Sequence, residues 1–250
     1  PRYFVKIADE SGTVVATLDL AGGKGIHKTV WGMSVEGVGP NRRGGPMAAP
    51  GAYTAVAFKE MDGEAKEIGE PVTFELVSIF EPTIPSQDRD QVLALLRDWG
   101  KFLNQSSAVT QTLGERRDQI ENLISLLRTH PSSTAALLAE ARELKNRMDD
   151  FDTMLNGDER KAEKWVRSEP GINSRLRTAF YGASRGTHGP TQTHREQWEI
   201  ATTQFGAIKE ELIKLIDEEM ETFEDKLDAA GLPWTNGRDI AAGLEEEEEE

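Results

Sequence analysis

Apolar residues recur at helical spacing through the second part of the chain. Three such stripes indicate long amphipathic helices. The first stripe consists of Val92, Leu96, Trp99, Leu103, Leu113, Ile120, Ile124 and Leu127. Ser106, Thr110 and Arg117 occupy its middle positions, so this part of the stripe is weakly apolar. We expect one long helix, with Ser86 as N-cap, that ends before Pro131.

The second stripe follows Ser132 and Ser133 and ends at Asn156-Gly157, which is a helix stop signal. It consists of Leu137, Ala141, Leu144, Met148, Phe151 and Leu155. Shorter helices are expected at 159–166 and 172–183. The third stripe starts after a capping box formed by Thr193 and Glu196 and ends at Gly231. It consists of Trp198, Ala201, Phe205, Ile208, Leu212, Leu215, Phe223 and Leu227.

These stripes predict an antiparallel helical bundle at 86–231, with Trp165 and Phe180 plugging one end. We expect residues 159–183 to act as a fourth arm, which would make the last helix antiparallel to the first. The alternative use of the stripes is a coiled-coil homodimer.

The first part of the chain has the alternation of strands. Tyr3, Val5 and Ile7 share one face, and further strands are expected at 13–18, 27–33, 53–58 and 72–77. Short strands separated by turns favour a small Ig-like β-sandwich at 1–81, with Trp31 as the core residue. The fold class is therefore all-β plus all-α, an Ig-like sandwich followed by an antiparallel bundle.

Two prolines, Pro82 and Pro85, predict a stiff connector at 82–85 between the two domains. A C-terminal segment at 232–244 and an acidic tail or tag at 245–250 follow the bundle, and the like charges of the tail favour disorder. Because the chain begins with Pro1 directly before a strand, we expect it to be a piece of a longer protein.

Composition narrows the function classes. The formal net charge of −15 disfavours nucleic-acid and anionic-membrane partners, and no stretch has the length and apolarity of a membrane span. The chain has no cysteine, which excludes disulfides and cysteine nucleophiles.

Three elements of the chain resemble a known family. They are Gly25-Ile26-His27-Lys28-Thr29-Val30-Trp31, then Pro50-Gly51-Ala52-Tyr53-Thr54-Ala55, and finally Gly231-Leu232-Pro233-Trp234-Thr235-Asn236-Gly237-Arg238. Their order resembles the C-terminal region of bacterial sortilin-like β-propeller proteins, which are described as glycosyl hydrolases with BNR repeats. In that family an Ig-like module and a helical region follow the propeller.

The resemblance implies a non-catalytic C-terminal structural or interaction module of an exported, propeller-bearing protein. Its expected partner is its own N-terminal propeller or another protein, and its location is periplasmic, cell-surface or secreted. Gly32, Met33 and Ser34 depart from the Asp, apolar and Arg residues usual in the family. The alternative is part of a glycosidase-like hydrolase whose catalytic residues lie in the propeller or in an interdomain cleft.

No residue pattern indicates a catalytic, cofactor or metal site. The chain has four histidines, which are His27, His130, His188 and His194. No two of them have the spacing of paired metal ligands on one helical face. Asp149, Asp150 and Asp152 are interpreted as a solvated helix face. The same interpretation applies to Glu210, Glu211, Asp217, Glu218, Glu219 and Glu221. The loop at 182–190 has the composition of an anion site. This loop and the loop at 41–45 are interpreted as ordinary exposed connections. Trp234 is expected to fold back onto one of the domains.

Overall fold

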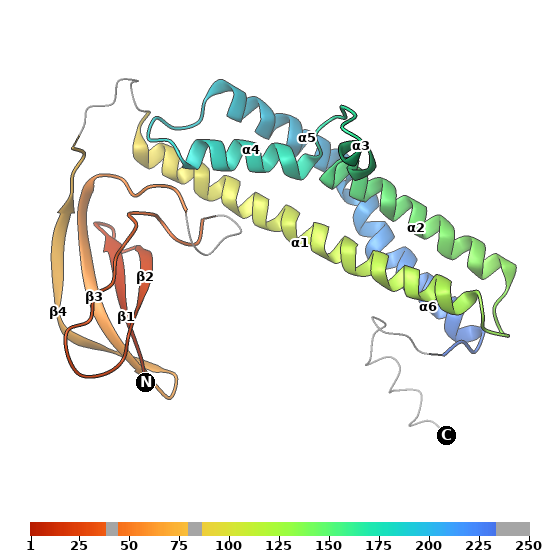
Figure 1. The fold of residues 1–250 in the computed structure, drawn as a ribbon, viewed down its shortest axis with the longest axis horizontal. Coiled ribbons are helices and arrows are strands. Elements are labelled where there is room, and N and C mark those ends of the chain that lie inside the picture. Colours follow the sequence, from red (N-terminus) through yellow and green to blue (C-terminus); the bar gives the residue numbers. More distant parts are fainter. Residues whose placement is uncertain (39–44, 80–86, 234–250) are drawn as a thin grey trace. The chain divides into compact units, whose positions relative to one another are not determined.

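The computed structural model describes residues 1–38, 45–79 and 87–233. A four-stranded antiparallel sheet comes first and helices follow (Figure 1). The predicted connector at 82–85, the segment from Trp234 onward, the acidic tail and most of the loop at 41–45 lie outside the described residues. The chain forms two compact units. One is Pro1–Asn104 with Arg177–Glu196, and the other is Gln105–Leu176 with the described residues from Gln197 onward.

The sheet has the strand order β2-β1-β3-β4. Its strands are β1 (Arg2–Asp9), β2 (Val14–Leu20), β3 (Gly51–Met61) and β4 (Glu64–Leu76). The β1–β2 turn is fixed by Asp9, whose Oδ1 accepts hydrogen bonds from the backbone N–H groups of Ser11 and Thr13. The β3–β4 turn at Asp62-Gly63 has both residues at positive φ, which suits a two-residue hairpin. The two turns lie between segments that the sequence predicts as neighbouring strands.

The aromatic residues of the sheet lie on its two faces. Phe4 and Phe58 stack with ring centroids 5.4 Å apart. On the opposite face Trp31 contacts Tyr53 at 5.3 Å between ring centroids. Trp31 therefore packs on the sheet from the segment between β2 and β3.

The strand predicted at 27–33 is wrong, because these residues form no strand. Val30 of this segment and Ile26 before it are exposed, and the His27 ring hydrogen-bonds with the carbonyl of Gly23 in the preceding glycine-rich turn. The strand predicted at 72–77 starts earlier, at Glu64, because pairing with β3 continues past Pro71.

The long predicted helices are present. They are α1 (Arg89–Leu127), α2 (Ala135–Asn156) and a third rod made of α5 (Gln192–Ile213), the π-helical turn η1 (Lys214–Glu219) and α6 (Met220–Ala229). Most predicted stripe residues are buried, whereas Val92, Leu137, Trp198 and Ile208 are half-buried. In the second unit, salt bridges join Arg117 of α1 to Asp149 of α2, and Lys226 of α6 to Glu140 of α2.

The directions of the paired helices contradict the expected fourth arm of the bundle. Arg117 of α1 pairs with Asp149 of α2, and Glu121, one turn later in α1, pairs with Lys145, one turn earlier in α2. The two helices therefore run antiparallel. Arg147 pairs with Glu219 and Glu140 pairs with Lys226, so α2 and α6 are antiparallel too. Hence α6 runs in the direction of α1, and the expectation of a fourth arm is wrong.

Helix starts also differ from the predicted ones. Asp88 caps α1 by accepting from the backbone N–H groups of Asp90 and Gln91, and the predicted N-cap Ser86 lies outside the described residues. Thr134 caps α2, one to two residues after the predicted start. At α5 the capping box is wrong, because the hydroxyl of Thr191 accepts the N–H of His194 and Thr193 already lies inside the helix. In each case a neighbouring residue with an equally suitable side chain takes the cap.

The two short helices are α3 (Glu159–Glu163) and α4 (Ile172–Ser184). Phe180 is buried, as expected, but Trp165 is 97% exposed and plugs nothing. Helix α3 stops three residues before the predicted end, and Trp165 takes a left-handed backbone conformation with φ of 57°.

Candidate functional site

Two glycines, Gly157 and Gly171, lie at the two ends of the segment between α2 and α4. An added Cβ on Gly171 would lie 2.4 Å from the backbone nitrogen of Gly157, so only a residue without a side chain fits. Residues 157–171, which we term the α2–α4 loop, therefore start and end at one narrow neck. Surface loops whose ends meet in this way are frequently functional.

A buried amide fixes the helices on both sides of the neck. Asn173 of α4 is 4% exposed, and its Nδ2 donates to Asn156 of α2 at 3.0 Å. Its Oδ1 accepts from the hydroxyl of Ser106 at 2.8 Å, and its Nδ2 also donates to Thr110 at 2.9 Å. The amide thus joins α1, α2 and α4, and this satisfied network holds the base of the loop.

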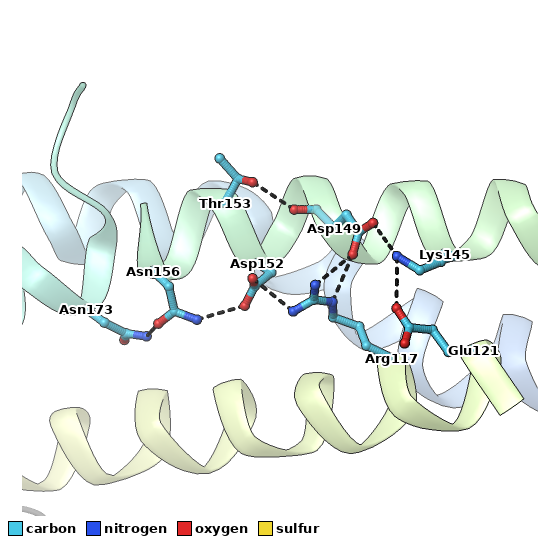
Figure 2. A network of polar contacts seen from close by, with 8 residues as sticks. All are labelled: Arg117, Glu121, Lys145, Asp149, Asp152, Thr153, Asn156 and Asn173. Carbon is cyan, nitrogen blue, oxygen red and sulfur yellow. Dashed lines mark hydrogen bonds and ion pairs between the residues drawn. The ribbon is translucent and has the colours of Figure 1, made fainter. Parts of the chain in front are cut away.

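From Asn156 the polar contacts continue along the α1–α2 seam, as Figure 2 shows. Asn156 donates to Asp152 at 2.7 Å, and Asp152 pairs with Arg117 at 2.9 Å. Arg117 also pairs with Asp149 at 2.8 Å, and Asp149 pairs with Lys145 at 2.7 Å. We call this chain of contacts, from Ser106 to Lys145, the polar seam.

The charges of the seam determine its acid–base chemistry. Partial burial acts to raise the pKa of Asp149, but the hydrogen bonds and charges of Lys145 and Arg117 outweigh it, so its pKa lies below the ordinary carboxyl value. The pKa of Lys145 is raised in return, chiefly by its hydrogen bond to Asp149. A general acid needs a carboxyl with a raised pKa, so the lowered pKa of Asp149 does not suit it for that role.

A cavity of about 810 Å³ lies beside the α2–α4 loop. Its size is within the range of ligand sites. Its apolar lining comes from Met154 of α2, Ile172 of α4, and Ala207 and Ile208 of α5, with Pro170 at the loop's end. Its charged lining is Asp158, Lys161, Arg167 and Glu169.

Two of the charged lining residues come from the two ends of the loop, and both are ion-paired. Asp158 pairs with Lys161 at 3.2 Å, and Glu169 pairs with Arg175 at 3.0 Å. Hydrogen bonding from the backbone and side chain of Lys161 lowers the pKa of Asp158. Both carboxylates therefore have a cation beside them, and the Glu169 side chain is 93% exposed, so its pair contributes little stability.

The acidic residues that the sequence places on solvated helix faces are only partly exposed. Asp150 is exposed, but Asp149 and Asp152 are half-buried in the polar seam. Glu219 is also half-buried, and its hydrogen bond with Arg147 lowers its pKa. The one sign in the sequence was the run of polar residues, Ser106, Thr110 and Arg117, on the buried side of α1.

The histidines lie apart from this loop. His130 accepts the backbone N–H of Ser132, and His194 accepts that of Thr191, so both serve as local caps. Burial, with a smaller contribution from the charge of His188, lowers the pKa of His194. In the described part of the chain, no three His, Asp or Glu side chains cluster as metal ligands would.

Among the helices that the structure describes, none combines the length and the apolarity of a membrane span. Comparisons with models of protein families, with curated proteins and with solved structures give no match for this chain.

Proposed function

We propose that this chain is a non-catalytic structural and interaction module, and that the α2–α4 loop is its interaction site. One observation carries the proposal. Trp165 is 97% exposed on a loop that two glycines and a buried amide hold in place. Tryptophan is the residue most enriched at binding hot spots, and an exposed one lowers solubility unless a partner covers it.

The finer fold assignment belongs to the same proposal. The sheet, with Trp31 packed on Tyr53, is one layer of an Ig-like module, and α1, α2 and the α5–α6 rod form an antiparallel bundle. The resemblance described above supports an exported parent with an N-terminal propeller, and the partner is that propeller or another protein.

The test is a direct assay of purified protein against chromogenic glycosides of several sugars and linkages. We expect no turnover, because Asp149 and Asp158, the acids with shifted pKa values nearest the cavity, have lowered and not raised values. Turnover that a single Asp or Glu substitution abolishes would contradict the proposal and would favour the glycosidase-like alternative.

A further inference from the structure

The α2–α4 loop places a large apolar residue where the backbone favours glycine. The N–H of Trp165 donates to the Ala162 carbonyl at 3.0 Å, and the N–H of Val166 donates to the Lys161 carbonyl at 2.9 Å. These two bonds form a Schellman motif that ends α3, with Trp165 at the left-handed position. Tryptophan here gains neither burial nor an easy backbone conformation, so the fold of the loop does not explain it.

Apolar exposure in the second unit is concentrated at this loop. Among the described residues of that unit, the exposed large apolar side chains are Met154, Trp165, Val166, Ile200 and Ile213. Trp165 and Val166 belong to the loop, and Met154 lines the adjoining cavity. Trp165 itself does not line that cavity. One loop therefore carries a large exposed aromatic side chain and borders an apolar cavity that this side chain does not fill.

The charges of the loop are balanced and only partly paired within the chain. Residues 157–171 contain four acids and four cations, whereas the whole chain has a formal net charge of −15. Asp158 pairs with Lys161, and Glu169 pairs with Arg175. The other charged residues of the loop have no ion pair with a described residue, and they are Glu159, Arg160, Glu163, Lys164 and Arg167. Unpaired side chains of both signs are thus available to a partner.

These features describe a surface that is complementary to itself. We propose that the α2–α4 loop binds the same loop of a second copy of this chain, with Trp165 of each copy inserted into the apolar cavity of the other. Two identical chains most often meet through the same patch on both copies, related by a two-fold axis. Trp165 and the cavity belong to one patch, so such a contact brings each against its complement. This inference rests on the proposed interaction site and specifies its partner.

Charge and size both favour this partner. Two negatively charged chains repel each other least where their surfaces are locally neutral, and the loop has equal numbers of acids and cations. An unpaired acid of one copy, such as Glu163, can pair with a cation of the other, such as Lys164. The cavity of about 810 Å³ has room for an indole ring, whose burial supplies the apolar part of the contact. A nucleic acid gains nothing from a neutral loop on an acidic chain.

The experiment is sedimentation equilibrium of the full chain over about 1–200 µM, beside two variants. We expect a reversible monomer–dimer equilibrium for the parent and association at least about tenfold weaker for Trp165→Gly. Glycine suits the left-handed position, so this variant keeps the loop's backbone. Met154→Lys places a charge in the apolar lining of the cavity, at an exposed position of α2, and should weaken association about as much.

A mixture of the two variants gives the sharpest test. Trp165→Gly keeps the cavity and Met154→Lys keeps the tryptophan, so their heterodimer has one intact contact, whereas either homodimer has none. The mixture should therefore associate more tightly than either variant alone. The matched control is Ile26→Gly, which removes an equally exposed apolar side chain from the first unit and should leave association unchanged.

Three results would overturn the inference. They are a parent that stays monomeric at about 200 µM, a dimer that survives Trp165→Gly, and a mixture that associates no more tightly than either variant. Glycoside turnover is measured separately. A monomeric chain without turnover contradicts only the choice of partner, whereas turnover contradicts the proposed function itself.

Discussion

At the residue scale, Asn173 is the side chain on which the loop's base depends. It was placed on no predicted stripe, yet its amide is buried and makes three hydrogen bonds to three different partners. A buried polar group that loses its partner costs more than the bond itself contributes, because its desolvation is no longer compensated.

We therefore expect Asn173→Ala to lower the free energy of unfolding by about 2–3 kcal/mol, since it leaves the buried hydroxyl of Ser106 without its acceptor. Urea unfolding followed by circular dichroism measures this loss. Asn146→Ala, an exposed amide on α2, is the control and should change stability by less than about 0.5 kcal/mol. Equal stability of the two variants would mean that the amide network contributes nothing.

The ion pairs of Asp149 predict a pH dependence. Because its pKa is lower in the folded chain than in the unfolded chain, the folded state binds fewer protons and gains stability as pH rises through the ordinary carboxyl range. That contribution is complete above the unfolded pKa, and it disappears as pH falls through the folded pKa.

Asp149→Asn removes this titration. The difference in unfolding free energy between the parent and Asp149→Asn should be largest near neutral pH and should shrink steadily below about pH 4. Parallel stability curves from neutral to acid pH would show that Asp149 keeps its ordinary pKa. Asp150→Asn, which changes an exposed neighbour, provides the comparison.

At the scale of elements, glycine has opposite roles in the neck and in α1. A Cβ at Gly171 would meet Gly157 nitrogen at 2.4 Å and Leu155 oxygen at 2.8 Å, both backbone atoms. Gly114 lies within α1, and apart from the backbone of its own helix a Cβ there would meet no described atom within 4 Å. The first glycine is required by close approach, whereas the second only weakens a helix.

Gly171→Ala is expected to destabilise the chain by about 2 kcal/mol or more, because the backbone must move to relieve the clash. Gly114→Ala should instead stabilise it by about 0.5–1 kcal/mol through helix propensity. Thermal unfolding of the two variants beside the parent tests both signs. A tolerated alanine at 171 would mean that the neck is open.

Leu144 tests the buried stripe of α2. It is 5% exposed, and the stripe continues through Ala141 and Met148, both fully buried. Leu144→Ala should cost about 2–5 kcal/mol, whereas Met154→Ala, on an exposed position of the same helix, should cost far less. A loss below about 0.5 kcal/mol for Leu144→Ala would contradict the assignment of this face to the core.

Periodicity predicts the long helices and the paired strands β1–β2 and β3–β4, because the burial of one face depends on residues that are near one another in the sequence. It failed where a long-range contact decides the structure. Residues 27–33 alternate like a strand, but they pair with no strand. Asp149 and Asp152 read as surface charges, because nothing near them in the sequence marks Arg117 as their partner.

The same limit explains why the candidate site was missed. Trp165 was expected to plug the helices, since a tryptophan between apolar stripes is usually buried. Its exposure follows from the early end of α3 and from the close approach of Gly157 and Gly171, and neither is visible as a local pattern.

At the scale of the whole molecule, two divisions of the chain compete. The prolines predict a boundary at 82–85, with all helices on one side. The contacts instead group Pro1–Asn104 with Arg177–Glu196, so that α1 contributes residues to both units. A helix that passes through two units can either couple their unfolding or fray between them, and the unfolding of a helical fragment distinguishes the two outcomes.

Most buried side chains of α1, α2 and α5–α6 lie in the second unit, and they include Leu113, Ile120, Leu123, Met148, Leu155, Leu212, Leu215, Phe223 and Leu227. We therefore expect the fragment 87–233 to fold alone and to unfold in one cooperative helical transition. Leu144→Ala should then lower its stability by about as much as in the full chain, within roughly 0.5 kcal/mol. A fragment with helical circular dichroism but no cooperative transition would contradict this expectation and would show that residues before 87 are needed for cooperative folding of the helices.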